Sequence, residues 1–317
     1  MMDESGEPDE QEQAGASQAS RGGTWTEHDR RMQELIVNYP VQAIQLFAAE
    51  EAERIDQGAR IISLRQEMEK HGLSRPLRRL DVPMRVEWSN GEREGLMFVI
   101  ESETVASAFN IHRMAHYCLD LAEFEDLTRV VPVVVFLDRG AAPSELRLEG
   151  DRATYLTFWY RTFVLPGVHY SVYRDSDNIV ARICLPLMGW KDPEEKVDVC
   201  AHAVMGIRQL ESNPERQEKW IENVDRYTRL NDDELEQMRR EYPQEGSAMA
   251  GLIDRAREET TQEANAKTLL RQIERKFGSE AKEASRARVE GAEIGELEMW
   301  LDRILDAECV EDVFSTD

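Results

Sequence analysis

Alternating apolar and polar positions define the central part of the chain. The stretches 81–88 and 95–103 alternate in this way, and the turn residues Ser89, Asn90 and Gly91 lie between them. Such alternation predicts half-buried β-strands, and Asn-Gly between two alternating runs is a strong hairpin signal. We therefore predict an antiparallel hairpin here.

The hydrophobic pattern also selects the register of this hairpin. With a three-residue loop and Gly91 in the left-handed conformation, Trp88 faces Glu92 and the apolar side chains of both strands share one face. A two-residue turn would slip the pairing by one residue and place Leu96 opposite Arg85. The predicted pairs are Val86 with Glu94, Met84 with Leu96, and Val82 with Phe98. The predicted core face consists of Val82, Met84, Val86, Trp88, Leu96, Phe98 and Ile100.

Carboxylates gather on the opposite face of the predicted hairpin. Asp81 lies across from Val99 in this register, Glu101 is its diagonal neighbour, and Glu103 follows on the same face. Mg²⁺ usually takes one or two carboxylates and keeps several waters. A cation held in this way polarises a phosphoryl oxygen and lowers the pKa of a bound water. Asp81 and Glu101 are therefore a candidate pair for a hard divalent cation.

The remaining pattern predicts an α/β region followed by helices. Two helices broken at Pro40 are expected within 27–55, residues 61–64 form a strand or a helix, and a helix is expected at 107–125. The β-branched run 130–137 is typical of a parallel strand covered on both faces. We expect a loop at 138–150, strands at 154–165 and 179–185, and helices beyond residue 194.

A strand with Asp, a strand with Glu-x-Glu, a helix and a further strand resemble the core of the PD-(D/E)XK nucleases. The closer resemblance is to the bacterial recombination-promoting nucleases, a transposase-like branch, and it covers about residues 29–137. The helix of that branch bears an Arg and a Tyr one turn apart, matched here by Arg113 and Tyr117. Residues 269–314 resemble a small helical domain often fused to this branch.

The resemblance implies a restriction-endonuclease-like core and a Mg²⁺- or Mn²⁺-dependent DNA endonuclease. Asp81, Glu101 and Glu103 would ligate the metal, and Arg113 would contact the scissile phosphate or brace Glu101. Glu103 departs from the family pattern, which has Lys or Gln there, and it would serve as an additional ligand or a weak base. Cleavage of both strands of a duplex needs two sites, which favours a homodimer.

Composition favours a different class of protein. The formal net charge is −24, whereas Lys and Arg contacts to phosphates supply most non-specific affinity for DNA. Residues 75–139 carry 8 basic and 11 acidic side chains, so the candidate core is nearly balanced. The alternative is an inactive nuclease-like scaffold that binds a protein partner. A further alternative is a regulatory protein whose acidic tail mimics DNA.

The chain is expected to contain four parts. These are a disordered acidic tail at 1–24, a nuclease-like domain at 25–190, a helical extension and linker at 191–265, and a small all-α domain at 266–317. No signal peptide or transmembrane run is evident, and the four cysteines are widely spaced. A reducing cytoplasmic location is therefore expected, without a membrane association.

Other candidate residues have ordinary structural interpretations as well. His112 and His116 have zinc-competent spacing but no third ligand in view, so we expect one to pack inward and one to lie at the surface. Glu34 or Glu51 could add a carboxylate to the metal site, or simply lie on a solvated helix face. An arginine cluster ahead of Asp81 could bind a phosphate or form a solvated loop edge; it consists of Arg75, Arg78 and Arg79.

Overall fold

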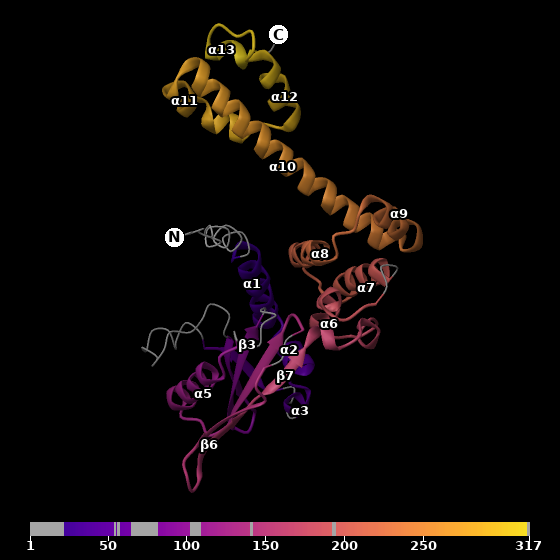
Figure 1. The fold of residues 1–317 in the computed structure, drawn as a ribbon. Helices are drawn as coiled ribbons and strands as arrows, with labels where there is room; N and C mark the ends of the chain where they lie inside the picture. Colours follow the sequence, from indigo (N-terminus) through magenta and orange to yellow (C-terminus); the bar gives the residue numbers. More distant parts are fainter. Residues whose placement is uncertain are drawn as a thin grey trace, which may run out of the picture. The chain divides into compact units, whose positions relative to one another are not determined.

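Residues 22–53, 55, 58–64, 82–101, 109–139, 142–191 and 195–315 are described by the computed structural model. They form a mixed α/β chain, which divides by its internal contacts into the units Met1–Glu234 and Leu235–Asp317 (Figure 1). The described residues of the first unit include a five-stranded sheet and a separate two-stranded sheet. Among the described residues, no helix is long and apolar enough to cross a membrane.

The predicted hairpin is confirmed together with its register. Strands β2 (Val82–Glu87) and β3 (Arg93–Glu101) pair antiparallel, with Val82, Met84 and Val86 opposite the predicted partners. Gly91 has φ +86°, and its N–H donates to the carbonyl of Trp88 at 3.0 Å. Only glycine adopts this backbone conformation without strain, which explains why the three-residue loop ends on Gly91.

The five-stranded sheet combines an antiparallel and a parallel part. Its strand order is β1-β2-β3-β4-β7, where β1 is Arg60–Ser63, β4 is Val130–Phe136 and β7 is Arg161–Val164. The first three strands pair antiparallel, whereas β4 is parallel to both β3 and β7. Residues 133–136 of β4 are buried, as expected for a strand covered on both faces.

Helix α5 (Ile111–Glu125) covers one face of this sheet. Its residues form a buried cluster with Val134 and Phe136 of β4. Gly95 of β3 allows this close approach, because a Cβ at that position would lie 3.0 Å from Cδ2 of Leu121. On the same side, the Arg85 guanidinium pairs with Glu125 at 2.5 Å, so the face predicted to be charged is partly buried as well.

Among the described residues, three helices precede the sheet, and both α1 and α2 contact it. They are α1 (Gly22–Asn38), α2 (Pro40–Phe47) and α3 (Ala49–Ala52), and Pro40 begins the second helix, as predicted. Phe47 of α2 packs edge-to-face on Phe163, with ring centroids 5.3 Å apart. Phe163 pairs with Val135 of β4. The side chain of Val135 points away from the cluster on α5, because its neighbours Val134 and Phe136 point into that cluster. Helices α2 and α5 therefore lie on opposite faces.

Four predictions of secondary structure are wrong in whole or in part. The expected loop at 138–150 contains strand β5 (Glu145–Glu149), which pairs with β6 (Thr154–Trp159) in the separate sheet. Only β7, the last part of the expected strand at 154–165, extends the main sheet. The segment 179–185 forms helix α6 (Ile179–Ile183), and the helix expected from residue 107 begins at Ile111.

The sequence at 179–185 predicts a strand in place of helix α6 because this segment is buried all round. Residues 179–183 are all buried, Arg182 included, and a short segment that is buried throughout has no period that separates strand from helix. Asn178 supplies the missing signal, since its side chain accepts a hydrogen bond from the Ala181 amide and caps the helix. The 3₁₀ helices η1 (Leu165–Gly167) and η2 (Tyr170–Val172) precede α6, and η3 (Leu185–Leu187) follows it.

The first unit closes with two longer helices. Helices α7 (Glu195–Leu210) and α8 (Pro214–Thr228) confirm the expected helical pattern beyond residue 194. Tyr39 joins α1 and α2 to this region, because its hydroxyl donates to Glu211 and accepts from Trp220 Nε1 at 3.0 Å. This network ties the helices that precede the sheet to those that follow it.

The second unit is all helical. Helix α9 (Asp232–Glu241) leads into α10 (Pro243–Phe277), which Gly278 ends with φ +95°. Helices α11 (Ser279–Glu290), α12 (Ile294–Arg303) and α13 (Val310–Val313) follow. The buried cluster of this unit includes Leu269, Ile273, Leu297 and Trp300, whereas Leu305 is 71 % exposed and does not join it. The predicted boundaries at 190 and 265 stay predictions.

Candidate functional site

The structure describes only part of the predicted carboxylate site. Asp81 and Glu103 lie outside the described residues, as do Arg75, Arg78 and Arg79. Glu101 is the last residue of β3 and pairs with Phe136 of the neighbouring parallel strand. Among the described side chains, no three His, Cys, Asp or Glu residues come together as a metal site. The three predicted ligands therefore stay a prediction.

The chain path nevertheless brings Glu101 and the start of α5 to one edge of the sheet. Strands β3 and β4 are parallel, and α5 is the crossover that connects them. Such a helix must begin near the carboxyl end of the first strand and run back to the start of the second. Both Glu101 and Arg113 thus belong to the carboxyl edge of the sheet, where open α/β proteins commonly bind ligands.

Arg113 lies in the first turn of α5, with its backbone fixed by a cap. The side chain of Asn110 accepts a hydrogen bond from the Arg113 amide at 3.0 Å. Arg113 is only 8 % exposed, and Tyr117, one turn later, is 1 % exposed and belongs to the core cluster. The predicted pair therefore shares the buried side of the helix.

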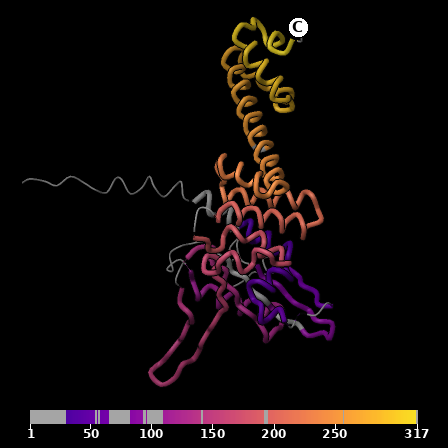
Figure 2. Tube along the Cα trace, turned by 90° about the vertical axis from the view of Figure 1, so that its right-hand side faces the viewer, coloured from indigo at the N-terminus to yellow at the C-terminus, as the bar shows by residue number. Residues whose placement is uncertain are grey.

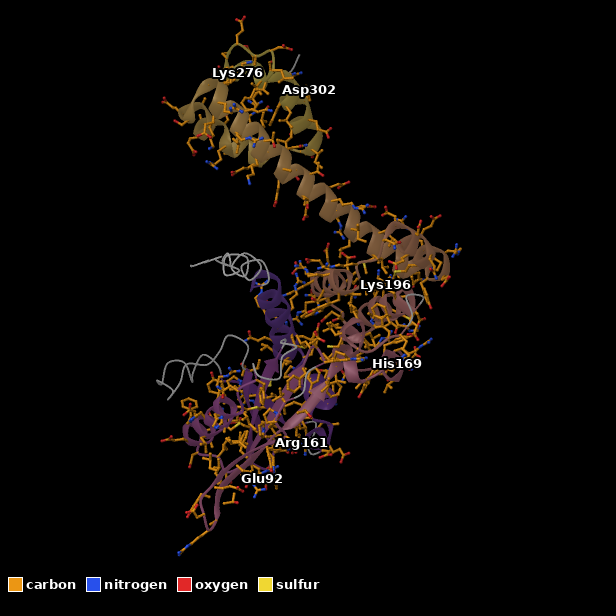
Figure 3. All side chains as sticks on the ribbon, in the orientation of Figure 1. Glu92, Arg161, His169, Lys196, Lys276 and Asp302 are labelled. Carbon is orange, nitrogen blue, oxygen red and sulfur yellow. The ribbon has the colours of Figure 1, made fainter. Side chains whose placement is uncertain are left out.

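The other residues proposed from the sequence have different positions. His112 is exposed and His116 is half-buried, in keeping with one surface and one inward-facing histidine. Glu34 of α1 pairs with Lys219 of α8 at 2.7 Å. Glu51 of α3 pairs at 2.8 Å with Arg161 of β7, which is labelled in Figure 3. Both carboxylates join elements of the first unit, which supports a structural role for them.

A second polar cluster was missed from the sequence. The ring nitrogens of His202 face Asp175 at 3.3 Å and Asp198 at 3.4 Å. Asp198 also accepts a hydrogen bond from the Tyr170 hydroxyl, and burial together with this bond raises the pKa of Tyr170 to about 12. Asp198 and His202 stand four residues apart on one helix, a spacing that could have suggested the contact.

Arg182 of α6 also belongs to this cluster. It is 3 % exposed, and its Nε and Nη2 atoms donate to the carbonyl of His202 at 3.0 and 2.5 Å. A Cβ on Gly206 would lie 2.4 Å from Arg182 Nε, so that glycine makes room for the guanidinium against α7. Burial lowers the pKa of Arg182. The hydrogen bonds of Arg182 join α6 to α7, and the His202 ring lies between two carboxylates, which supports a structural role.

Comparison with known protein families, curated proteins and solved structures finds no match for this chain. The fold class that the structure supports is mixed α/β with small sheets. Any function must therefore be argued from the residues and their arrangement.

Proposed function

We propose that this chain is a metal-dependent DNA endonuclease with a restriction-endonuclease-like core, of the recombination-promoting type. One observation carries the proposal: an antiparallel β1-β2-β3 meander is followed by the crossover helix α5 and the parallel strand β4. The resemblance of the sequence to the PD-(D/E)XK nucleases implies this order of elements. Glu101 ends the third strand of the series, where that resemblance expects a ligand.

The donor set suits a hard divalent cation. Asp81, Glu101 and Glu103 offer only carboxylate oxygens, which Mg²⁺ and Mn²⁺ prefer over nitrogen or sulfur ligands. A bound cation would polarise the phosphoryl oxygen and lower the pKa of its water. Glu103 brings no positive charge to the phosphate, unlike a Lys at that position. Cleavage by this chain should therefore depend more strictly on the cation than cleavage by a nuclease with Lys at that position.

Arg113 fits a positioning role better than a direct contact with DNA. Its side chain is 8 % exposed, so a phosphate in solvent would reach little of the guanidinium. It belongs to the same sheet edge as Glu101, the residue that it would orient. Residues that hold a metal ligand in place commonly affect metal affinity or activity by about 10–100-fold. Arg113→Lys should weaken cleavage and metal binding together, because the planar guanidinium is lost while the charge is kept.

Cleavage of supercoiled plasmid with Mg²⁺, Mn²⁺ or EDTA tests the proposal. Wild type should cut only with a cation. Asp81→Ala or Glu101→Ala should cut on the order of 100-fold or more slowly, because the cation stabilises the transition state by several kcal/mol. Glu92→Ala is the matched control. It removes an exposed carboxylate beside the turn, at the other end of the same hairpin (Figure 3). The control should cut like wild type.

Equal cutting by wild type and by both ligand variants would contradict the assignment of the site. Absence of cutting by wild type under every condition would instead favour the scaffold interpretation. The net charge of −24 gives that alternative its specific support.

A further inference from the structure

Strand β6 is uncovered on the side away from β5. Strands β5 and β6 form a two-stranded ribbon that projects from the first unit, as Figures 1 and 2 show from two directions. Within the described parts of the chain, β5 is the one strand that pairs with β6. Tyr155 is 76 % exposed and Trp159 is 69 % exposed. An isolated two-stranded ribbon is only marginally stable in water, so this one needs support.

The base of the ribbon has such support, whereas its outer part has none. Leu146 is buried in the α5 cluster, and Phe158, its cross-strand partner, packs against that cluster. Further out, the cross-strand pair Leu148 and Leu156 lies on the same face with 48 % and 36 % exposure. The apolar face thus continues from the core into solvent.

The free edge of β6 has little protection against pairing beyond one irregularity in its register, which lies at its outer end between Thr154 and Leu156. Its sequence is Thr-Tyr-Leu-Thr-Phe-Trp, without a charge, a proline or a glycine. Native proteins protect exposed edges with charged side chains, prolines or bulges that twist the edge away. Strand β5, by contrast, carries Glu145, Arg147 and Glu149. The uncharged edge of β6 is therefore the edge better suited to receiving another strand.

We propose that two copies of this chain pair antiparallel through their β6 edges and form a continuous four-stranded sheet. The charge distribution favours a second copy as the occupant. Each chain has a net charge of −24, but residues 145–159 carry three acidic and two basic side chains, and β6 itself carries none. Two copies therefore approach with least repulsion along this edge.

The pattern of β6 is self-complementary. A two-fold pairing centred on Thr157 places Leu156 of one copy opposite Phe158 of the other, so the two apolar faces merge. A shift by one residue would set the side with Leu156 and Phe158 in one copy against the side with Thr157 in the other. Isologous contacts of this kind are the commonest in soluble oligomers. The proposal goes beyond the proposed function and does not depend on it, although it would also bring two sites into one assembly.

The first test is the mass of the full chain in solution by light scattering. We expect twice the chain mass of 36.5 kDa for wild type and for Glu101→Ala. Thr157→Lys should give the single-chain mass, because it places two ammonium groups across the two-fold axis. Leu119→Lys is the control: Leu119 is 60 % exposed on α5, so it adds the same charge away from the ribbon and should leave the dimer intact.

Disulfide trapping tests the register. Thr157→Cys, in a Cys309→Ser background, should cross-link under mild oxidation, because directly opposed residues have Cα atoms about 4.5–5.5 Å apart. The three remaining cysteines are buried. Arg147→Cys is the matched control, since Arg147 pairs with Thr157 inside the ribbon. Its two copies would stand three strand spacings apart, about 14–15 Å, which exceeds the reach of a disulfide.

A wild-type chain that stays at the single-chain mass would overturn the proposal and leave the edge to a strand of another protein. A dimer that survives Thr157→Lys would also overturn it, because another surface would then hold the copies together. Cross-linking of Arg147→Cys but not of Thr157→Cys would exclude the β6 pairing. None of these measurements depends on DNA cleavage, so they fail separately from the proposed function.

Discussion

The two hairpins of the first unit have similar strand chemistry and very different surroundings. The β2–β3 hairpin lies inside the five-stranded sheet, with Met84 at 1 % exposure and helices on both faces of that sheet. The β5–β6 hairpin packs on α5 only at its base, and further out Leu148 is 48 % exposed. Alternation of apolar and polar residues makes both of them strands. The elements packed around a hairpin decide how much its apolar residues contribute to stability.

Truncation of one apolar residue in each hairpin should give the largest contrast. Met84→Ala should lower the free energy of unfolding by about 2–5 kcal/mol, because it opens a cavity in a packed core. Leu148→Ala should change it by no more than about 0.5 kcal/mol in the monomeric Thr157→Lys background. Urea unfolding of both variants measures the difference. Equal losses would show that the outer ribbon is packed as tightly as the sheet.

Acid should weaken the contact between Tyr39, which lies between α1 and α2, and Glu211, which follows α7. Burial opposes ionisation, but hydrogen bonds from the Tyr39 hydroxyl and the Asn213 amide outweigh it and lower the pKa of Glu211 below its ordinary 4.5. A carboxyl with a lowered folded-state pKa stabilises the protein above its unfolded pKa and loses this contribution as the pH falls through the folded value.

Glu211→Gln should therefore cost about 1.5–3 kcal/mol at pH 7, the range for hydrogen bonds to a charged group. The difference between wild type and variant should shrink as the pH falls below 4.5. Urea unfolding at pH 7 and at acid pH measures this effect. Glu215→Gln, in the first turn of α8, is an exposed control. A constant difference at all pH values would show that the ionised form of Glu211 is not the stabilising one.

The turn glycines of the two hairpins should respond differently to alanine. Gly91 has φ +86°, so Gly91→Ala should cost about 1 kcal/mol from backbone strain alone. Gly150 lacks this conformation, and an added Cβ would meet Cε2 of Tyr155 at 2.9 Å. That ring is exposed and can rotate away, so Gly150→Ala should cost less. Thermal unfolding of the two variants compares them, and the reverse order would contradict the assigned turn geometry.

Thiol labelling should show how well each hairpin is shielded from solvent, and it should disturb the fold less than the substitutions above. Cys118 on α5 is buried over the main sheet, and burial raises the pKa of the Cys200 thiol to about 12. In a Cys309→Ser background, native protein should therefore react very slowly with iodoacetamide. Adding Leu148→Cys should give one rapidly labelled site, counted by mass spectrometry. Rapid labelling of Cys118 would contradict the packing of α5.

The sequence predicted the β2–β3 hairpin well because its turn and its pattern agree. Gly91 and the position of Leu96 fixed the register before any tertiary contact was considered. Burial of a short segment gives no such information, and for this reason the sequence does not distinguish helix α6 from a strand. The loop prediction at 138–150 gave too much weight to Gly, Pro and Ser and overlooked the alternation Glu-Leu-Arg-Leu-Glu in β5.

The sequence predicts which helix and strand carry the residues of the candidate site better than it predicts the contacts of their side chains. Arg113 and Tyr117 were correctly placed on one helix face, and Glu101 at a strand end. The burial of Arg113 depends on contacts with residues distant in the sequence, which no local pattern contains. The same holds for His202, whose two carboxylate neighbours come from α7 and from the loop before α6.

The most direct test of the proposed metal site is the thermal stability of the protein with increasing Mn²⁺. A ligand that binds only the folded state stabilises it by about 2.7 kcal/mol at one hundred times its Kd. Wild type and Glu92→Ala should show a midpoint that rises with Mn²⁺, and Glu101→Ala should show almost no rise. A wild-type midpoint that does not change with Mn²⁺, or an equal rise in Glu101→Ala, would contradict the account.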